Sequence, residues 1–172
     1  ICAVTSAFSA IPAVADTIVP PIQGNTSSVS GTAPLVSGTA ELNIPTLWVA
    51  GDSTAAAFND TNYYSPRAGW GTQLGLYIQG VNIQNMAVSG TSSKTYADTD
   101  QYQTILQNIK AGDYLMIGFG HNDERPELGR YTNPGGSPSV VGSFQYYLFE
   151  KYIQPAKERG AIPILVTPIV RR

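Results

Sequence analysis

The stretch TLWVAGDSTAAAF at residues 46–58 decides the fold. Its first half is a short apolar run that ends in a turn, which is typical of a buried β-strand. Ser53 follows that turn at a place where a helix could begin, and a serine there often caps the helix. A serine just after a buried strand is also where a nucleophile could stand. The stretch alone leaves both interpretations of Ser53 open.

Apolar runs of the same kind recur along the chain and alternate with amphipathic stretches. Gly160 is expected to end a helix predicted at 143–159. The alternation predicts an α/β protein of the three-layer αβα class, with a parallel sheet and helices on both faces. Buried strands are predicted at 46–52, 81–88, 114–120 and 162–168, a polar turn at 89–96, and helices at 100–110 and 143–159. The expected inward residues of the second helix are Phe144, Tyr147, Leu148, Tyr152 and Ile153.

The region before the first strand has a different composition. Residues 1–15 resemble the apolar and cleavage parts of a secretory signal, so the sequence is expected to begin inside that signal. Residues 16–43 are rich in Ser, Thr, Gly and Pro and predict a flexible linker. Asn25 and Asn59 match the glycosylation acceptor pattern. The packed domain is expected over residues 44–172.

Composition limits the classes of function. The 172 residues carry a net charge of −2 and show no basic stripe, so a nucleic-acid partner is not expected. The sequence lacks an apolar stretch long enough to predict a membrane span. With one cysteine and one histidine, no metal site is expected, and without a glycine-rich phosphate loop no cofactor is expected either.

Polar turns follow three of the four predicted strands, and in parallel sheets sites form at these carboxyl ends. The turns are GDST at 51–54, SGTS at 89–92 and GHND at 120–123. Together they offer a hydroxyl at Ser53, a backbone N–H at Gly90 and a side-chain amide at Asn122. A nucleophile with donors for an oxyanion is the inventory of acyl transfer. Taken singly, each residue would be read as a cap or a turn former.

These three turns resemble the first three sequence blocks of the SGNH (GDSL-like) hydrolases. Within that superfamily the chain is most similar to rhamnogalacturonan acetylesterase-like carbohydrate esterases, over about residues 46–172. The resemblance implies a flavodoxin-like sheet with four of its five strands present. It implies that Ser53 is the nucleophile, and that Gly90, Asn122 and the Ser53 N–H form the oxyanion hole. The matching stretches are GDST, NMAVSGTSSKTY and GHND, with GWG at 69–71, RYTNP at 130–134 and GAIPILVTPIVRR at 160–172.

The sequence departs from the family in one respect. The family places its catalytic Asp and His in an Asp-x-x-His block after the last strand, and no Asp-x-x-His occurs in this sequence. We therefore expect the domain to be C-terminally incomplete, and these 172 residues alone to be inactive. His121 adjoins Asn122, but the family has no base at that position. His121 and Trp70 are instead candidates for substrate contact, with packing as the alternative for Trp70.

Four further charged residues lie in or near the polar turns and have expected roles. Asp52 and Asp123 are expected to accept hydrogen bonds from nearby backbone N–H groups. Arg125 and Arg130 are candidates to face an acidic pectin-like substrate, with simple solvation at the surface as the alternative.

Three hypotheses of function follow from the resemblance. The first is a secreted serine esterase that removes acetyl groups from a plant cell-wall polysaccharide such as rhamnogalacturonan. The second is a non-catalytic carbohydrate-binding relative, and the third is a lipase or acylesterase of the same superfamily. The acetylated polysaccharide is the expected partner, and the complete domain is expected to be a monomer.

Overall fold

The structure is a computed structural model that describes residues 43–58 and 67–170. The chain divides into two units, residues 1–40 and 41–172, and every described residue belongs to the second. The predicted signal remnant, nearly all of the predicted linker, and both glycosylation sequons lie outside the described residues.

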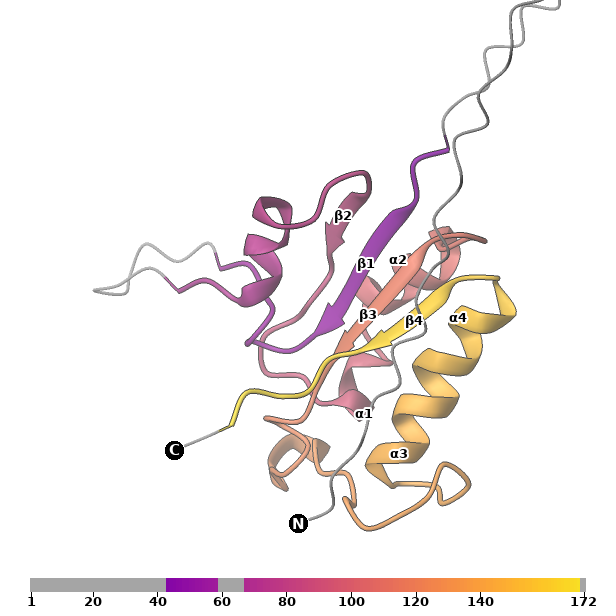
Figure 1. The fold of residues 1–172 in the computed structure, drawn as a ribbon. Helices are drawn as coiled ribbons and strands as arrows, with labels where there is room; N and C mark the ends of the chain where they lie inside the picture. Colours follow the sequence, from indigo (N-terminus) through magenta and orange to yellow (C-terminus); the bar gives the residue numbers. More distant parts are fainter. Residues whose placement is uncertain (1–42, 59–66, 171–172) are drawn as a thin grey trace, which may run out of the picture. The chain divides into compact units, whose positions relative to one another are not determined.

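Four strands form one parallel sheet in the order β2-β1-β3-β4 (Figure 1). They are β1 (Thr46–Gly51), β2 (Asn82–Asn85), β3 (Tyr114–Gly118) and β4 (Ile162–Leu165). The two central strands, β1 and β3, have the most buried residues, in accord with their apolar sequences. The predicted parallel α/β sheet is confirmed.

The helical segments are short. They are η1 (Trp70–Leu76, 3₁₀), α1 (Ser93–Tyr96), α2 (Asp100–Asn108), η2 (Glu127–Gly129, 3₁₀), α3 (Phe144–Tyr146), η3 (Tyr147–Ile153, a π-helix) and α4 (Gln154–Glu158). The predicted helix at 143–159 is therefore present, but its middle is wound as a π-helix. The π turns directly precede Pro155, whose ring would clash with the carbonyl four residues earlier in a regular α-helix.

The prediction of a plain polar turn at 89–96 was wrong, because residues 93–96 form α1. Ser92 caps this helix: its Oγ accepts a hydrogen bond from the Thr95 N–H, and the Thr95 Oγ1 accepts one from the Ser92 N–H. This reciprocal capping satisfies two backbone donors at once, so a stretch of small polar residues holds a helical turn.

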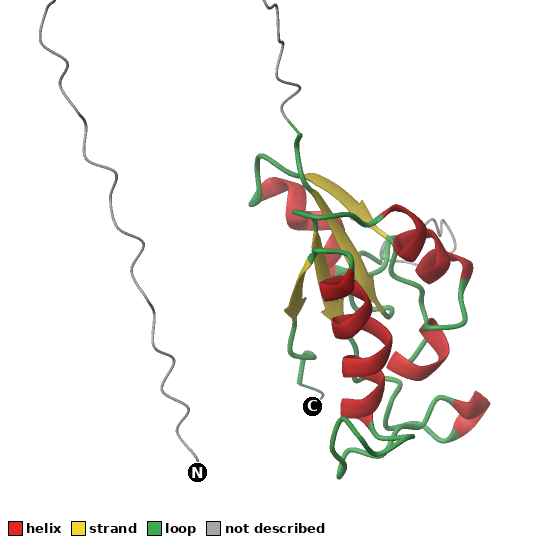
Figure 2. Cartoon of the chain, turned by 90° about the vertical axis from the view of Figure 1, so that its right-hand side faces the viewer, coloured by secondary structure: helices red, strands yellow, loops and turns green. Residues whose placement is uncertain are grey.

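One face of the sheet is covered by α1, α2, η3 and α4, and Figure 2 shows most of the helices gathered on one side of the strands. Four aromatic rings fill the centre of this layer, with neighbouring ring centroids 5.0–6.2 Å apart. They belong to Tyr96, Tyr102, Phe119 and Tyr152. The helix predicted at 100–110 packs into this layer through Tyr102, Ile105 and Ile109, which are buried.

The opposite face carries a thinner layer. The Trp70 ring of η1 packs over Gly118 of β3, where a Cβ atom would lie 3.0 Å from the ring. Beyond η1 a hollow of about 230 Å³ opens between Leu47, Ile78 and Met116. Helical residues thus lie on both faces of the sheet, but unequally in the described part of the chain.

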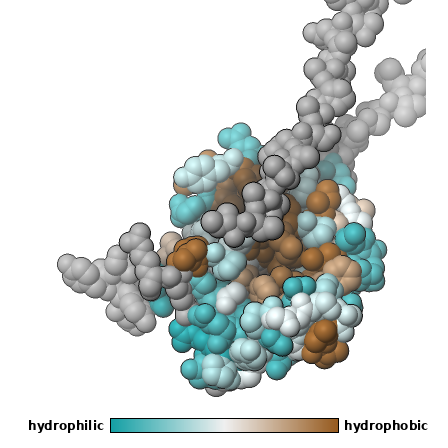
Figure 3. Space-filling model, turned by 60° about the horizontal axis from the view of Figure 1, so that its bottom comes forward, coloured by the Kyte–Doolittle hydropathy of each residue, from teal (hydrophilic) through white to brown (hydrophobic). Residues whose placement is uncertain are grey.

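The prediction that the fourth strand is buried was wrong, because Ile162 and Leu165 are 49% and 57% exposed. In the described residues β4 pairs only with β3, so it forms an edge of the sheet. Figure 3 shows apolar residues gathered on the face that lies at the bottom of Figure 1, where the strands end. Among residues 43–58 and 67–170, no helix has the length and apolar character needed to cross a membrane.

Candidate active site

The turn after β1 is held by Asp52, which is buried. Its Oδ1 accepts hydrogen bonds from the Thr54 N–H and the Thr54 hydroxyl, both at 2.8 Å. Residues 53–55 form a turn, and residues 56–58 after it are not helical, so Ser53 does not cap a helix there. The half-buried Ser53 makes no side-chain hydrogen bond to a described residue. This geometry favours the nucleophile over the cap.

The turn after β2 brings Gly90 to the same edge of the sheet. The Val88 N–H donates to the carbonyl of Gly51 at the end of β1, at 2.9 Å, so the two turns leave the sheet side by side. Gly90 has a φ of +83°, a conformation that L side chains rarely adopt. The exposed Gly90 presents bare backbone at the position where the prediction places an oxyanion donor.

The turn after β3 places Asn122 against the second turn. Asn122 is 6% exposed, and its Nδ2 donates to the Thr91 carbonyl at 2.9 Å. That contact uses one of the two Nδ2 protons. The N–H groups of Ser53 and Gly90 donate to no described residue. The structure therefore brings the Gly90 and Asn122 turns into contact at the strand end that carries Ser53.

Asp123 does more than the sequence indicated. It was expected to bond local backbone, but its carboxylate accepts hydrogen bonds from the N–H and the hydroxyl of Ser93, thirty residues away, and from the Thr132 hydroxyl at 3.0 Å. The Tyr152 hydroxyl in turn donates to the Ser93 carbonyl. Burial raises the pKa of Asp123 above its ordinary value, hydrogen bonds from Ser93 and Thr132 act against that increase, and the Asp52 charge adds to it. This buried network ties the start of α1 to the GHND turn.

The two predicted substrate-contact residues already have protein neighbours. The Trp70 ring packs over Gly118, and the backbone N–H of Trp70 donates to the Thr54 carbonyl at 2.8 Å. The His121 Nε2 lies within hydrogen-bond distance of the Ile169 carbonyl, beyond β4. Part of the Trp70 ring is in packing contact with Gly118. A substrate role for Trp70 or His121 stays a prediction.

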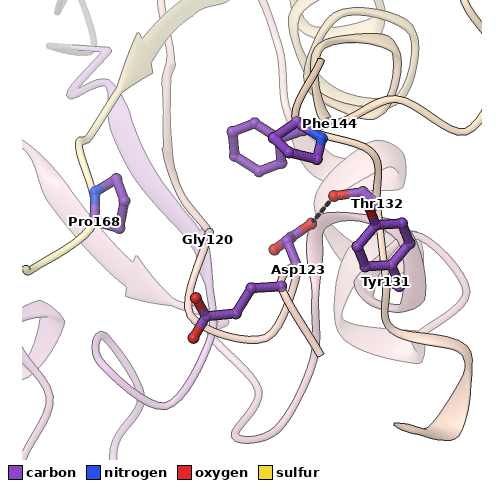
Figure 4. Close-up of a pocket in the computed structure, with 8 residues that line it drawn as sticks. Gly120, Asp123, Tyr131, Thr132, Phe144 and Pro168 are labelled. Atoms are coloured by element: carbon purple, nitrogen blue, oxygen red, sulfur yellow. Dashed lines mark hydrogen bonds between the residues drawn. The ribbon is translucent and has the colours of Figure 1, made fainter. Parts of the chain in front are cut away.

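A hollow of about 230 Å³ lies against the GHND turn at Gly120 and Asp123 (Figure 4). In Figure 4 Asp123 and Thr132 point toward each other at its wall, and Pro168 stands across from Phe144. This volume is below the range of about 300–1,000 Å³ that is usual for small-molecule sites. The hollow is lined by Gly120, Asp123, Glu124, Tyr131, Thr132, Pro134, Phe144 and Pro168. It is therefore an apolar recess at the GHND turn, and its lining includes none of Ser53, Gly90 and Asn122.

Within the described residues, no cluster of three or more His, Cys, Asp or Glu side chains could hold a metal ion. The functional groups at this edge of the sheet include the Ser53 hydroxyl, backbone N–H groups, the Asn122 amide and the Arg130 guanidinium.

The family model for GDSL-like lipase/acylhydrolases matches residues 47–170. The chain belongs to this family. It is 36% identical over 129 residues to "Probable rhamnogalacturonan acetylesterase YesY" of Bacillus subtilis, covering 73% of this chain and 54% of YesY. It is 37% identical over 127 residues to "Rhamnogalacturonan acetylesterase RhgT" of the same organism, covering 73% of this chain and 50% of RhgT.

Similarity extends to a fungal relative and to a solved structure. The chain is 38% identical over 97 residues to "Rhamnogalacturonan acetylesterase" of Emericella nidulans, covering 56% of this chain and 34% of that protein. The crystal structure of Bacillus subtilis YxiM superposes with a TM-score of 0.60 at 33% identity, covering 74% of this chain and 33% of YxiM. The chain spans about half the length of YesY and RhgT. The resemblance stated from the sequence is confirmed at the level of family and fold.

Sequence reasoning missed the contacts of Arg130. It was weighed as a solvated residue or as a contact for an acidic substrate, but its Nη1 lies 3.3 Å from both the Gly90 carbonyl and the Asn122 Oδ1. The only signal in the sequence was its position a few residues after the GHND turn, which does not say where the side chain points.

Proposed function

We propose that this chain carries the nucleophile and oxyanion donors of a serine esterase that removes acetyl groups from a pectin-type polysaccharide such as rhamnogalacturonan. One observation carries the proposal. The Ser53 hydroxyl makes no hydrogen bond to a described residue at the edge of the sheet where the Gly90 and Asn122 turns meet. The relatives named rhamnogalacturonan acetylesterase support the choice of substrate.

The roles follow from the chemistry of ester cleavage. The Ser53 Oγ would attack the acetyl carbonyl carbon, and the carbonyl oxygen would take up negative charge as the tetrahedral intermediate forms. The N–H groups of Ser53 and Gly90 and the second Nδ2 proton of Asn122 would donate to that oxygen. Collapse of the intermediate would break the bond between the acyl carbon and the sugar oxygen, and the base would pass the Ser53 proton to that oxygen. Water would then hydrolyse the acetyl–Ser53 ester and free acetate.

A general base must take the Ser53 proton, and the described residues supply no evident one. His121 is the only histidine in the sequence and contacts the Ile169 carbonyl. We propose that the base and its orienting acid come from outside these 172 residues, as the family resemblance implies.

The test uses a chimera in which this chain replaces the segment of RhgT that it matches. Acetate release from acetylated rhamnogalacturonan is measured for the parent chimera, Ser53→Ala and Asn122→Ala. We expect Ser53→Ala to abolish release, and Asn122→Ala to lower kcat by about 100- to 1000-fold, the usual effect of losing one oxyanion donor. Ser89→Ala, at an exposed serine of the neighbouring turn, is the matched control and should retain activity.

The same experiment separates the alternatives. Binding of the polysaccharide without Ser53-dependent acetate release would favour a non-catalytic carbohydrate-binding relative. Faster turnover of long-chain esters than of acetyl esters would favour a lipase or acylesterase, which the exposed apolar residues near the end of β4 could serve. Activity of Ser53→Ala within a few-fold of the parent would contradict the proposal.

We further propose that the protein is secreted, with residues 1–15 as part of its signal. The support is compositional: an apolar stretch ends in Ala13-Val14-Ala15, the small-x-small pattern of a cleavage site. N-terminal sequencing of protein recovered from the culture medium should read from Asp16. A product that retains residues 1–15 would contradict this.

A further inference from the structure

Arg130 connects the two turns that hold the proposed oxyanion donors. Its Nη1 donates to the Gly90 carbonyl and to the Asn122 Oδ1, each at 3.3 Å. Gly90 follows β2 and Asn122 follows β3, so a single guanidinium group bridges turns from two separate strands.

The guanidinium is held in place by its own turn of chain. The Arg130 Nε donates to the Glu127 carbonyl at 3.1 Å, and Nη2 lies 3.9 Å from the Glu127 carboxylate. The Arg130 side chain is 16% exposed, whereas that of Glu127 is 62% exposed. An exposed ion pair contributes little, so the backbone contact and the burial fix the position of the guanidinium.

Two contacts fix the orientation of the Asn122 amide. Its Oδ1 accepts from Arg130, while its Nδ2 donates to the Thr91 carbonyl at 2.9 Å. A flipped amide would set its NH₂ group against the guanidinium, donor against donor, and its oxygen against the Thr91 carbonyl, acceptor against acceptor. The observed orientation keeps the second Nδ2 proton available for a ligand.

Gly90 gains a restraint of the same kind. Its φ of +83° and its lack of Cβ contacts leave the backbone few steric limits at this position. The hydrogen bond from Arg130 to the Gly90 carbonyl limits rotation of this residue. That carbonyl belongs to the peptide group after Gly90, so the bond narrows the φ and ψ angles of Gly90 and through them restrains the direction of its N–H.

We propose that Arg130 is a positioning residue that fixes the Gly90 N–H and the Asn122 amide as a preformed oxyanion hole. The inference rests on the proposed esterase function of this site. Donors set in advance need no reorganisation when charge develops on the carbonyl oxygen, which is the source of their catalytic effect. The guanidinium charge also favours negative charge in its vicinity.

The kinetic test uses the RhgT chimera and a neutral substrate, p-nitrophenyl acetate, so that recognition of an acidic sugar plays no part. Arg130→Gln should lower kcat by about 10- to 100-fold, less than the about 100- to 1000-fold of losing a donor itself. KM should stay within about two-fold, because the residue acts on the transition state and not on substrate binding. Arg130→Lys should be intermediate, since its single ammonium keeps the charge without the planar fork. Added guanidinium ion should restore part of the activity of Arg130→Ala.

Lys151→Gln is the matched control. Lys151 is exposed on η3, outside the turns that hold the proposed donors, and the substitution removes the same charge. We expect its kcat and KM to equal those of the parent. A normal kcat in Arg130→Gln, a change confined to KM, or an equal loss in Lys151→Gln would each overturn the positioning role.

A second measurement uses the 172-residue chain itself and needs no catalysis. In ¹⁵N-labelled protein, the two Nδ2 protons of Asn122, assigned by their loss in Asn122→Asp, should shift and exchange faster with solvent in Arg130→Gln. They should be unchanged in Lys151→Gln. Unaltered Asn122 signals in Arg130→Gln would refute the positioning role of Arg130. If the chimera showed no Ser53-dependent turnover while the 172-residue chain showed the expected Asn122 changes, the esterase function would be refuted. The contact of Arg130 with Asn122 would still be supported.

Discussion

Replacement of Asp123 by asparagine should destabilise the fold less than replacement by alanine. The Oδ1 atom accepts from the Ser93 hydroxyl, from the Thr132 hydroxyl at 3.0 Å and from the Ser93 N–H at 3.1 Å. The Oδ2 atom accepts only from the Ser93 N–H, at 3.2 Å. An asparagine with its oxygen at the Oδ1 position keeps an acceptor for all three donors and carries no charge to desolvate, but its NH₂ group lies at the Oδ2 position against the Ser93 N–H.

The magnitudes follow from counting those donors. In Asp123→Ala all three donors lose their acceptor, at about 1–3 kcal/mol for each buried group. The two hydroxyls can rotate toward other acceptors, so we expect a loss of about 3–5 kcal/mol, out of about 5–15 kcal/mol for a whole domain. In Asp123→Asn the single donor–donor contact with the Ser93 N–H should cost about 1–3 kcal/mol, less than the loss in Asp123→Ala.

The two variants also test how Asp123 makes the stability of the fold depend on pH. Because burial holds the pKa of Asp123 above its ordinary value, the folded protein binds this proton more tightly than the unfolded chain does. The resulting stability is fully present below the carboxyl pKa of the unfolded chain and is lost as the pH rises through the folded-state pKa.

Urea denaturation followed by tryptophan fluorescence, over a series of pH values, measures both quantities. The decline with rising pH should be smaller in Asp123→Asn than in the parent. The reasoning would be refuted if Asp123→Asn lost as much stability as Asp123→Ala, or if it kept the pH dependence of the parent.

Three further predictions concern the fold. Burial raises the pKa of Asp113, but hydrogen bonds outweigh it and hold the pKa below its ordinary value. Its stabilisation is therefore present above the unfolded pKa and lost as the pH falls through the folded pKa. Asp113→Asn should cost about 2–4 kcal/mol in urea denaturation and weaken that acid dependence, because two of its four donors would then face an amide NH₂. Gly69→Ala should lower Tm, since its Cβ would lie 2.3 Å from the Ala55 carbonyl carbon, whereas Gly75→Ala, with open space around it, should not. Tyr96→Phe should cost about 1 kcal/mol in urea denaturation, because its hydroxyl donates to a backbone carbonyl after β2 at 2.8 Å.

Hydrophobic pattern predicted the central strands and the helix at 100–110 well, because burial there is nearly continuous or strictly periodic. It failed at residues 93–96, where reciprocal capping by Ser92 and Thr95 builds a helical turn from residues that also favour loops. It also failed at β4, whose apolar sequence indicated burial but whose residues lie at the sheet edge in the described part of the chain. An apolar run shows that a strand needs covering, and it does not show what covers it.

The site was predictable to the extent that topology alone placed it. Parallel strands end at one edge, so residues that directly follow strands could be brought together from the sequence. The partners of Asp123 and Arg130 could not be found in this way, because they are thirty residues away at Ser93 and forty residues away at Gly90. Such contacts depend on how turns pack after the sheet has formed, and periodicity carries no information about that packing.

The 172-residue polypeptide should be a poor esterase by itself. A serine hydroxyl is a weak nucleophile until a base takes its proton from about 2.6–3.2 Å away. The sole imidazole, His121, contacts the Ile169 carbonyl instead. Oxyanion donors without a complete triad typically leave about 10³–10⁴-fold catalysis over water, far below a working enzyme.

We therefore expect only weak hydrolysis of p-nitrophenyl acetate by the purified polypeptide, unchanged in His121→Ala, and much faster hydrolysis by the RhgT chimera. Robust turnover that disappears both in Ser53→Ala and in His121→Ala would show that His121 is the base. The His121 contact with Ile169 could then persist during catalysis, because Nε2–H can donate to that carbonyl while Nδ1 receives the Ser53 proton.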